Sequence, residues 1–264
     1  MHVVALMKLG APLEVESVAL ARDLGVAPYD ARMLVTGTPP CVVATLAEDR
    51  AKDLAGKMRL RGHGVVELDT ARVVAAEDMT SMRRFTLDTS GVGGGEDGRA
   101  WLPYEDVFAI LRTVHRRSKV HKEKVVERTF EAGTALMTGG LKMTSKKTTE
   151  IDEKVEEKEG VVYFFRRSGE RPWVLHEAGT RYTGLGPALL ATQVLNFQRT
   201  LDILRQRMTF ATYDDRLVSV KKVPERATSN ANGTKLETSS GGGVDLLAHV
   251  LASWIASSHQ TPYR

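Results

Sequence analysis

Residues 161–207 read VVYFFRRSGERPWVLHEAGTRYTGLGPALLATQVLNFQRTLDILRQR, and the larger part of the fold is organised around this stretch. Its first two apolar runs, 161–167 and 173–177, are rich in residues that favour strands. Between them lie Gly169 and Pro172, which are typical of a tight reversal of the chain. We therefore predict a β-hairpin here.

The second half of the same stretch changes from a strand-like to a helical period. Its apolar positions recur at spacings of three and four, the pattern of a helix with one face toward a core. These positions are Leu190, Val194, Phe197, Leu201 and Leu204. We predict an amphipathic helix over residues 189–207 that closes the hairpin unit.

The composition is that of a globular protein with an ordinary core. Hydrophobic residues make up 42% of the 264 positions, and the net charge of +4 is small against 37 basic and 33 acidic residues, so bulk charge does not argue for nucleic acid. The single cysteine, Cys41, allows no disulfide within the chain, which is typical of a reducing compartment. The first ten residues, MHVVALMKLG, lack the features of a signal peptide, and no apolar run is long enough for a membrane span. We expect a cytoplasmic protein.

The first quarter of the chain has the clearest pattern. Apolar strand runs alternate with helical segments, and Val15 and Val18 are among the residues at helical spacing in the first helix. Gly25 is a natural stop, and Pro28 suits the first turn of the next helix. The predicted strands are 2–7, 41–44 and 65–68, and the predicted helices are 13–24, 28–37 and 48–61. The order β-α-α-β-α-β predicts a small α+β sandwich with helices on one face of a sheet.

This segment resembles the C-terminal domain of the bacterial ribosomal stalk protein, whose fold the Clp protease adaptor shares. The resemblance rests on the early strand, on Ala31-Arg32 and Leu34-Val35 in the second helix, on Pro39-Pro40, and on residues 61–68, RGHGVVEL. It implies a domain over residues 1–75 that binds protein partners through its second helix. Arg32 matches a basic position of the family, while Tyr29 stands where another basic residue is expected. We name both as partner-binding candidates.

The remainder predicts a mainly-β domain over residues 83–222. A glycine-rich, acidic stretch at 89–98 precedes strand candidates at 101–110 and 122–130. A curved sheet closed by one C-terminal helix is similar to the plan of pleckstrin-homology-like domains. The fold class expected for the whole chain is thus α+β. Residues 223–243 are rich in Ser, Thr, Asn and Gly with little to bury, and we expect a disordered linker there.

Residues 112–124 form the densest basic stretch. Its candidate anion-binding residues are Arg112, Arg116, Arg117, Lys119, Lys122 and Lys124. One interpretation is a site for an anionic lipid headgroup or a nucleic-acid phosphate. The other is a solvated basic strand balanced by the acidic run 150–159. The stretch contains no interleaved aromatic residue for stacking on bases, which weakens the nucleic-acid version.

The chain shows no recognisable catalytic or cofactor motif. The seven histidines lack the close paired spacing of zinc ligands, and Cys41 lies in an apolar run typical of a buried thiol. The turn at 183–187, TGLGP, has no Lys-Ser/Thr pair and so favours a strand-to-helix connection over a phosphate loop. The carboxylates of Asp214 and Asp215 fit a capping turn better than acid–base chemistry. We expect no metal, no cofactor and no enzymatic activity.

Residues 244–264 predict a short amphipathic helix on a tether. Its apolar face carries Leu247, Val250, Leu251, Trp254 and Ile255, which we name as further partner-binding candidates. Such a helix either docks into a partner's groove or folds back onto its own domain, and both alternatives stay open at this point. Its polar face lacks Lys and Arg, which argues against binding to a membrane surface. We expect a regulatory or adaptor protein that binds another protein, with anion binding through residues 112–124 as the alternative.

Overall fold

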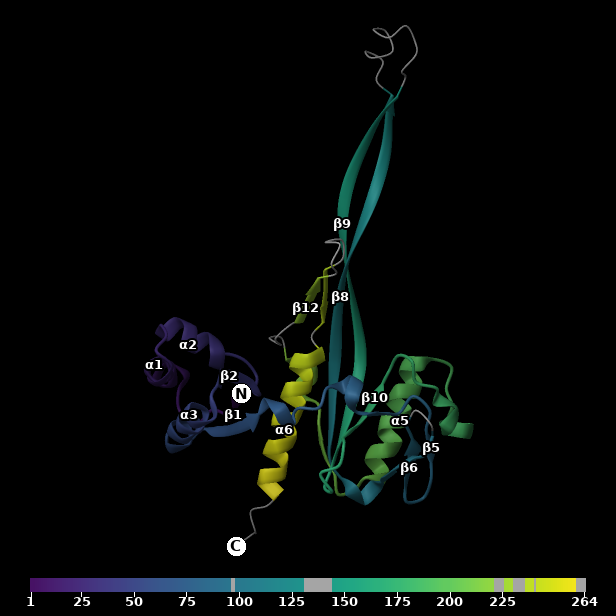
Figure 1. Ribbon diagram of the computed structural model, residues 1–264. Coiled ribbons are helices and arrows are strands. Elements are labelled where there is room, and N and C mark those ends of the chain that lie inside the picture. Colours follow the sequence, from purple (N-terminus) through teal and green to yellow (C-terminus); the bar gives the residue numbers. More distant parts are fainter. Residues whose placement is uncertain (96–97, 131–143, 221–225, 230–235, 240, 260–264) are drawn as a thin grey trace. The chain divides into compact units, whose positions relative to one another are not determined.

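The structure is a computed structural model that describes the backbone of residues 1–95, 98–130, 144–220, 226–229, 236–239 and 241–259 (Figure 1). Side chains are described for residues 1–95, 98–116, 157–220 and 242–258. The fold is α+β, as predicted. The chain divides into two compact units. Unit 1 comprises Met1–His115, Glu159–Glu225 and Ser240–Arg264, and unit 2 comprises Arg116–Lys158 and Arg226–Ser239.

The first quarter of the chain adopts the predicted β-α-α-β-α-β order. Its elements are β1 (His2–Lys8), α1 (Leu13–Leu24), α2 (Pro28–Val35), β2 (Cys41–Leu46), α3 (Glu48–Leu60) and β3 (Gly64–Asp69). The sheet order is β2-β1-β3, and both pairings are antiparallel. Gly25 ends α1 in the left-handed conformation, with φ of 71°, which a residue without Cβ adopts readily.

The central strand β1 is buried on both of its faces. Val4 and Leu6 belong to a core that they share with α1, α2 and α3. Val3, Ala5 and Met7 point to the opposite face, because side chains alternate along a strand, and there they belong to a second core. The continuous apolar run of β1 is explained by this two-sided burial.

The described residues of the remaining chain form short strands, two long strands and two helices, with 3₁₀ turns between them. The strands are β4 (Thr80–Ser81), β5 (Thr86–Leu87), β6 (Gly91–Gly94), β7 (Ala100–Pro103), β8 (Val107–Phe130), β9 (Thr144–Arg166), β10 (Trp173–His176), β11 (Thr212–Asp214), β12 (Arg226–Ser229) and β13 (Leu236–Ser239). The helices are α5 (Gln193–Arg207) and α6 (Gly241–His259), and the 3₁₀ turns are η1 (Thr70–Arg72), η2 (Ala76–Asp78), η3 (Tyr104–Asp106), η4 (Tyr182–Ala188) and η5 (Arg216–Ser219). One sheet has the order β12-β13-β8-β9-β10-β4, with β11 also on β8, and a separate sheet has the order β5-β6-β7.

The hairpin predicted from residues 161–177 is confirmed. β9 and β10 are antiparallel, with Trp173 opposite Phe164 and His176 opposite Val161. On one face of this hairpin, Val162 and Phe164 share a core with α5. The predicted closing helix therefore exists and packs where its pattern placed it.

The face of α5 differs from the prediction at its start. Leu190 precedes the helix and Val194 lies in its first turn, and both are exposed. Thr192 caps the helix by accepting a hydrogen bond from the backbone N–H of Leu195. Asn196 is buried instead, because its side-chain amide donates to the carbonyl of Leu190 and accepts from the N–H of the same residue. A satisfied polar side chain thus replaces part of the expected apolar stripe.

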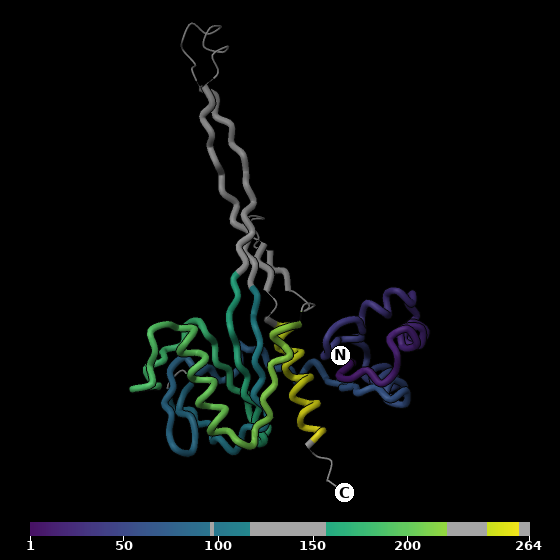
Figure 2. Tube along the Cα trace, turned by 180° about the vertical axis from the view of Figure 1, so that it is seen from behind, coloured from purple at the N-terminus to yellow at the C-terminus, as the bar shows by residue number. Residues whose placement is uncertain are grey.

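Helix α6 is the most deeply buried helix that the described residues contain. Figures 1 and 2 both show it between the strands β1 and β3 and the ends of β8 and β9 that belong to unit 1. The core around it contains Val3, Ala5 and Val66 from the first sheet, and Val161 and Tyr163 from β9. A helix that is apolar around most of its circumference is expected to be a core helix.

Unit 2 contains β12 and β13 together with the later part of β8 and the earlier part of β9. β12 pairs with β13, and β13 pairs with β8 with Thr238 opposite Ser118. Both strands lie inside residues 223–243, so the expectation of disorder is corrected for them. The unpaired backbone N–H and C=O groups at the edge of a sheet can pair with a further strand even when the side chains of that strand are polar. The rest of the predicted linker lies outside the described residues.

Candidate functional site

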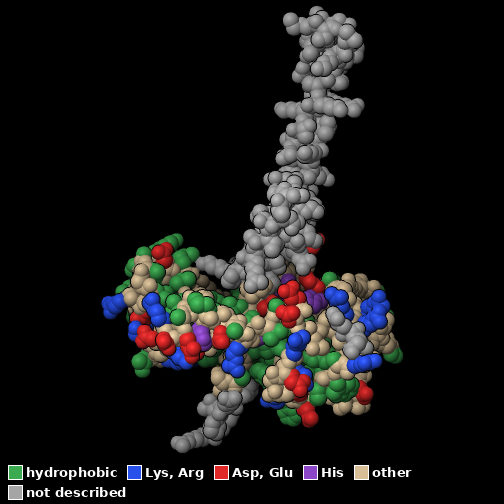
Figure 3. Space-filling view, in the orientation of Figure 1, with side chains coloured by type: hydrophobic (Ala, Val, Ile, Leu, Met, Phe, Trp, Pro, Cys, Tyr) green, Lys and Arg blue, Asp and Glu red, His purple; other side chains and the backbone are tan. Residues whose placement is uncertain are grey.

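The predicted partner-binding residues Tyr29 and Arg32 both lie on the solvent-exposed side of α2. Tyr29 is 71% exposed, and Met33, one turn further along, is also exposed. Val15 and Val18 on the neighbouring helix α1 are exposed as well, Val18 at 52%. We call these four apolar residues, Val15, Val18, Tyr29 and Met33, the α1–α2 surface. Figure 3 shows hydrophobic side chains gathered over α1 and α2.

The two helices that carry these residues pack against each other. α1 and α2 are in contact, and the guanidinium of Arg32 lies 4.0 Å from the carboxylate of Glu14. The four exposed side chains therefore lie on two helices that are in contact with each other.

The exposure of Val15 and Val18 follows from what α1 buries instead. Its inward face carries Glu16 and Ser17 together with Leu20 and Ala21. Glu16 has no exposed surface, and a buried carboxylate requires partners that compensate for its lost hydration. The buried carboxylate of Glu16 therefore decides which face of α1 points inward, and Val15 and Val18 lie on the outer side.

The partners of Glu16 come from the turn between α3 and β3. Arg61 donates two hydrogen bonds to its carboxylate, each 2.8 Å long, and a third of 2.8 Å to Asp23. His63 Nε2 lies 2.6 Å from Glu16 Oε2, while His63 Nδ1 accepts a hydrogen bond from the backbone N–H of Gly10. The ring proton is therefore on Nε2 and is donated to Glu16. Because both imidazole nitrogens and both carboxylate oxygens are engaged, this network is a structural clamp beneath the α1–α2 surface.

The structure corrects the expectation that the apolar face of the C-terminal helix contacts a partner. Leu247, Val250, Leu251 and Ile255 are all buried in the core around α6. Trp254 is partly buried against the same core. Of the two alternatives for this helix, the chain adopts the one in which the helix folds back onto its own unit. These five side chains pack against the core of unit 1 and do not form a free docking face.

The predicted anion-binding stretch lies in β8. Arg112 is partly buried and Arg116 is exposed. The side chains of Arg117, Lys119, Lys122 and Lys124 lie outside the described residues. Anion binding through residues 112–124 stays a prediction.

A hydrogen-bonded network that the sequence did not reveal connects β8, β9 and α6. The hydroxyl of Tyr163 donates to Asp245 Oδ1 at 2.6 Å, and His115 Nε2 lies 2.6 Å from the same hydroxyl oxygen. Asp245 Oδ2 accepts a hydrogen bond of 3.0 Å from the backbone N–H of Ala76. Burial, followed by the nearby charge of Asp245, raises the pKa of Tyr163 well above 10. The phenol stays protonated as a donor, and the network holds α6 against the sheet.

A second polar contact of α6 predicts a dependence of stability on pH. His249 Nε2 accepts a hydrogen bond from the N–H of Val74, and Nδ1 donates to the carbonyl of Asp245. Burial lowers the pKa of His249 below 6.5, and its interactions with Asp245 act in the opposite direction but are smaller. Since the unfolded chain binds the proton more tightly, this histidine stabilises the fold above pH 6.5, and the stabilisation is lost as the pH falls below that value.

We therefore expect the melting temperature to fall as the pH is lowered from about 7 to about 5, the window set by an unperturbed histidine. The fall should be smaller in His249→Gln, which cannot take up the proton. The carboxylates of Asp106 and Glu159, whose pKa values are lowered below 3.8 and 4.5, contribute only in more acidic solution. Thermal melts of both proteins across this range measure the difference. If the melting temperature fell equally with pH in the wild-type protein and in His249→Gln, this role of His249 would be contradicted.

Other kinds of site find no support in the described part of the chain. Among these residues no group of three or more His, Cys, Asp or Glu side chains is placed to hold a metal ion. None of the helices in the same ranges has the length and apolar character required to cross a membrane.

The comparisons with known proteins assign no family. No family model matches the chain, and no curated protein or solved structure matches it. The resemblances to the ribosomal stalk domain and to pleckstrin-homology-like domains therefore stay predictions that rest on the residues quoted above.

Proposed function

We propose that this chain is a non-enzymatic regulatory or adaptor protein that binds another protein through the α1–α2 surface. The observation that supports the proposal is the exposure of four apolar side chains, Val15, Val18, Tyr29 and Met33, on two helices that are in contact. Surface helices normally turn such residues inward, and a grouped apolar exposure is typical of an interaction site. The partner class is a protein that presents an apolar stripe.

The composition of the patch fits the same interpretation. Tyr, Met and Arg are enriched where proteins bind one another, and Tyr29, Met33 and Arg32 lie within two turns of α2. The clamp of Glu16, Arg61 and His63 fixes α1 from below, so the surface is preorganised. Preorganisation reduces the entropy lost on association and so favours binding.

Site-specific photo-crosslinking tests the proposal. A photoreactive phenylalanine at position 29 keeps the aromatic ring of Tyr29 and should form a discrete crosslinked product in cells that naturally contain the protein. Val18→Asp should reduce this product by about tenfold, the effect of losing a central contact of an interface. The same substitution should change the stability of the isolated protein by only about 0.5 kcal/mol or less, because Val18 is exposed.

The matched control is Leu60 at the end of α3. Leu60 is 90% exposed and apolar but lies outside the α1–α2 surface. A photoreactive group at position 60 should yield no discrete product, and Leu60→Asp should leave the product formed at position 29 unchanged. Equal products from positions 29 and 60, or no product at 29, would overturn the proposal.

A further inference from the structure

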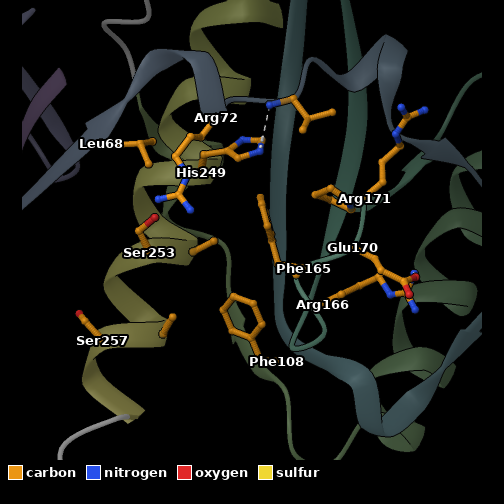
Figure 4. A pocket seen from close by; sticks show the side chains of 15 residues that line it. Leu68, Arg72, Phe108, Phe165, Arg166, Glu170, Arg171, His249, Ser253 and Ser257 are labelled. Atoms are coloured by element: carbon orange, nitrogen blue, oxygen red, sulfur yellow. Dashed lines mark hydrogen bonds and ion pairs between the residues drawn. The ribbon is translucent and has the colours of Figure 1, made fainter. Parts of the chain in front are cut away.

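An open pocket of about 860 Å³ lies between α6 and the turn that joins β9 to β10 (Figure 4). Its residues come from β3, η1, β8, β9, the turn and α6, all within unit 1. The volume is within the range of about 300 to 1,000 Å³ that is typical of small-molecule sites. The pocket is separate from the α1–α2 surface, since it shares no residue with that surface.

Two aromatic rings line one side of the pocket, and short side chains of α6 line another. Phe108 and Phe165 lie side by side with ring centroids 6.4 Å apart. Along α6 the pocket is lined by Ala252, Ser253, Ala256 and Ser257, together with the ring of His249. These short side chains leave space that a Leu or Phe at the same positions would fill. An apolar body can therefore contact both phenylalanine rings, whose planes are tilted by 53° to each other.

The charged groups around the pocket are mostly cationic. Arg72, Arg166 and Arg171 line it, against the single carboxylate of Glu170. Arg166 is engaged, because it forms ion pairs with both Asp106 and Glu170. Arg72 is exposed, and its guanidinium makes no hydrogen bond or ion pair with any side chain that the structure describes. Figure 4 shows the Arg72 side chain extending toward α6, on the side of the pocket where Ser253 and His249 lie.

We infer that this pocket binds a small anionic amphiphile, with an aliphatic or aromatic body over Phe108 and Phe165 and a carboxylate at Arg72. The apolar floor supplies the burial, and the guanidinium and the hydroxyl of Ser253 supply donors for the anionic group. The positive balance of the lining selects an anion over a neutral molecule of the same shape.

Calorimetric titration of the full chain with decanoate and with 1-decanol tests the inference. Decanoate should bind saturably with one molecule per chain, and 1-decanol should bind more weakly. Arg72→Gln should weaken decanoate by about fivefold, the upper range for a partly solvated ion pair, and should leave 1-decanol unchanged. Ala256→Phe should weaken both by about tenfold or more, because the new ring occupies the volume that the ligand needs.

Two controls separate this site from other surfaces. Arg199→Gln removes an exposed arginine that lines a different pocket, beside Tyr213, and should leave decanoate binding unchanged. Val18→Asp on the α1–α2 surface should also leave decanoate binding unchanged. The test of the pocket is therefore independent of the test of protein binding through the α1–α2 surface. Arg72 is exposed, so its variant folds even if Ala256→Phe does not. Absence of saturable decanoate binding, equal binding of 1-decanol, or indifference to Arg72→Gln would overturn the inference.

Discussion

Replacement of Leu251 by Asp is expected to unfold unit 1 rather than to release a docking helix. Leu251 is fully buried in α6, within the core that α6 shares with β1, β3 and β9. An unpaired carboxylate at this position should destabilise the protein by about 4 kcal/mol or more, a large part of the usual stability of a domain. Urea denaturation followed by circular dichroism measures the loss.

Two further substitutions calibrate this result. Leu251→Ala leaves a cavity without a charge and should lower the free energy of unfolding by about 2 to 5 kcal/mol. Ser257→Asp places the same charge on an exposed position of the same helix and should be close to neutral. If Leu251→Asp melted like the wild-type protein, α6 would not be a core helix in solution.

Glu16→Ala is the substitution with the second largest expected effect. It removes the central carboxylate from the clamp and leaves the imidazole of His63, which is fully buried, and the guanidinium of Arg61 without their principal partner. Loss of one partner from a buried ion pair typically destabilises a protein by about 3 to 5 kcal/mol. Chemical denaturation of the variant measures this change.

Glu14 provides the control, because it lies on the same helix with its side chain 72% exposed. Glu14→Ala should change the stability by no more than about 0.5 kcal/mol. Glu16→Gln should lie between the two, since it keeps the shape but not the charge. Equal effects of the alanine substitutions at positions 14 and 16 would show that the clamp contributes nothing to the fold.

Local structure was predictable wherever it depends only on residues that are a few positions apart in the sequence. Gly25 ends α1, Pro28 begins α2, and Gly169 and Pro172 lie in the turn between β9 and β10. Period-two and period-3.6 patterns identified the order of strands and helices in the first quarter of the chain. A period-3.6 pattern also identified α5, the helix that closes the hairpin. These features depend on backbone preferences that do not require the rest of the chain.

The orientation of the helices was not predictable in the same way. In α1 a charged residue, Glu16, faces inward while Val15 and Val18 face solvent. The reason is a set of partners, Arg61 and His63, that are distant in the sequence and become neighbours only in the folded chain. Hydrophobic periodicity contains no information about such compensation, so of the four residues of the α1–α2 surface only Tyr29 was predicted as a binding residue from the sequence.

By itself, the sequence determined the α+β class, the β-α-α-β-α-β order, the hairpin of β9 and β10 and the helix that packs on it. Tertiary structure alone decided that α6 lies between β1 and β9, that Tyr163 and Asp245 hold it there, and that a pocket opens beside Phe165. The physical reason is the range of the interactions. Turns and amphipathic periods are set by neighbours along the chain, whereas burial and polar compensation are set by residues that meet only after the chain has folded.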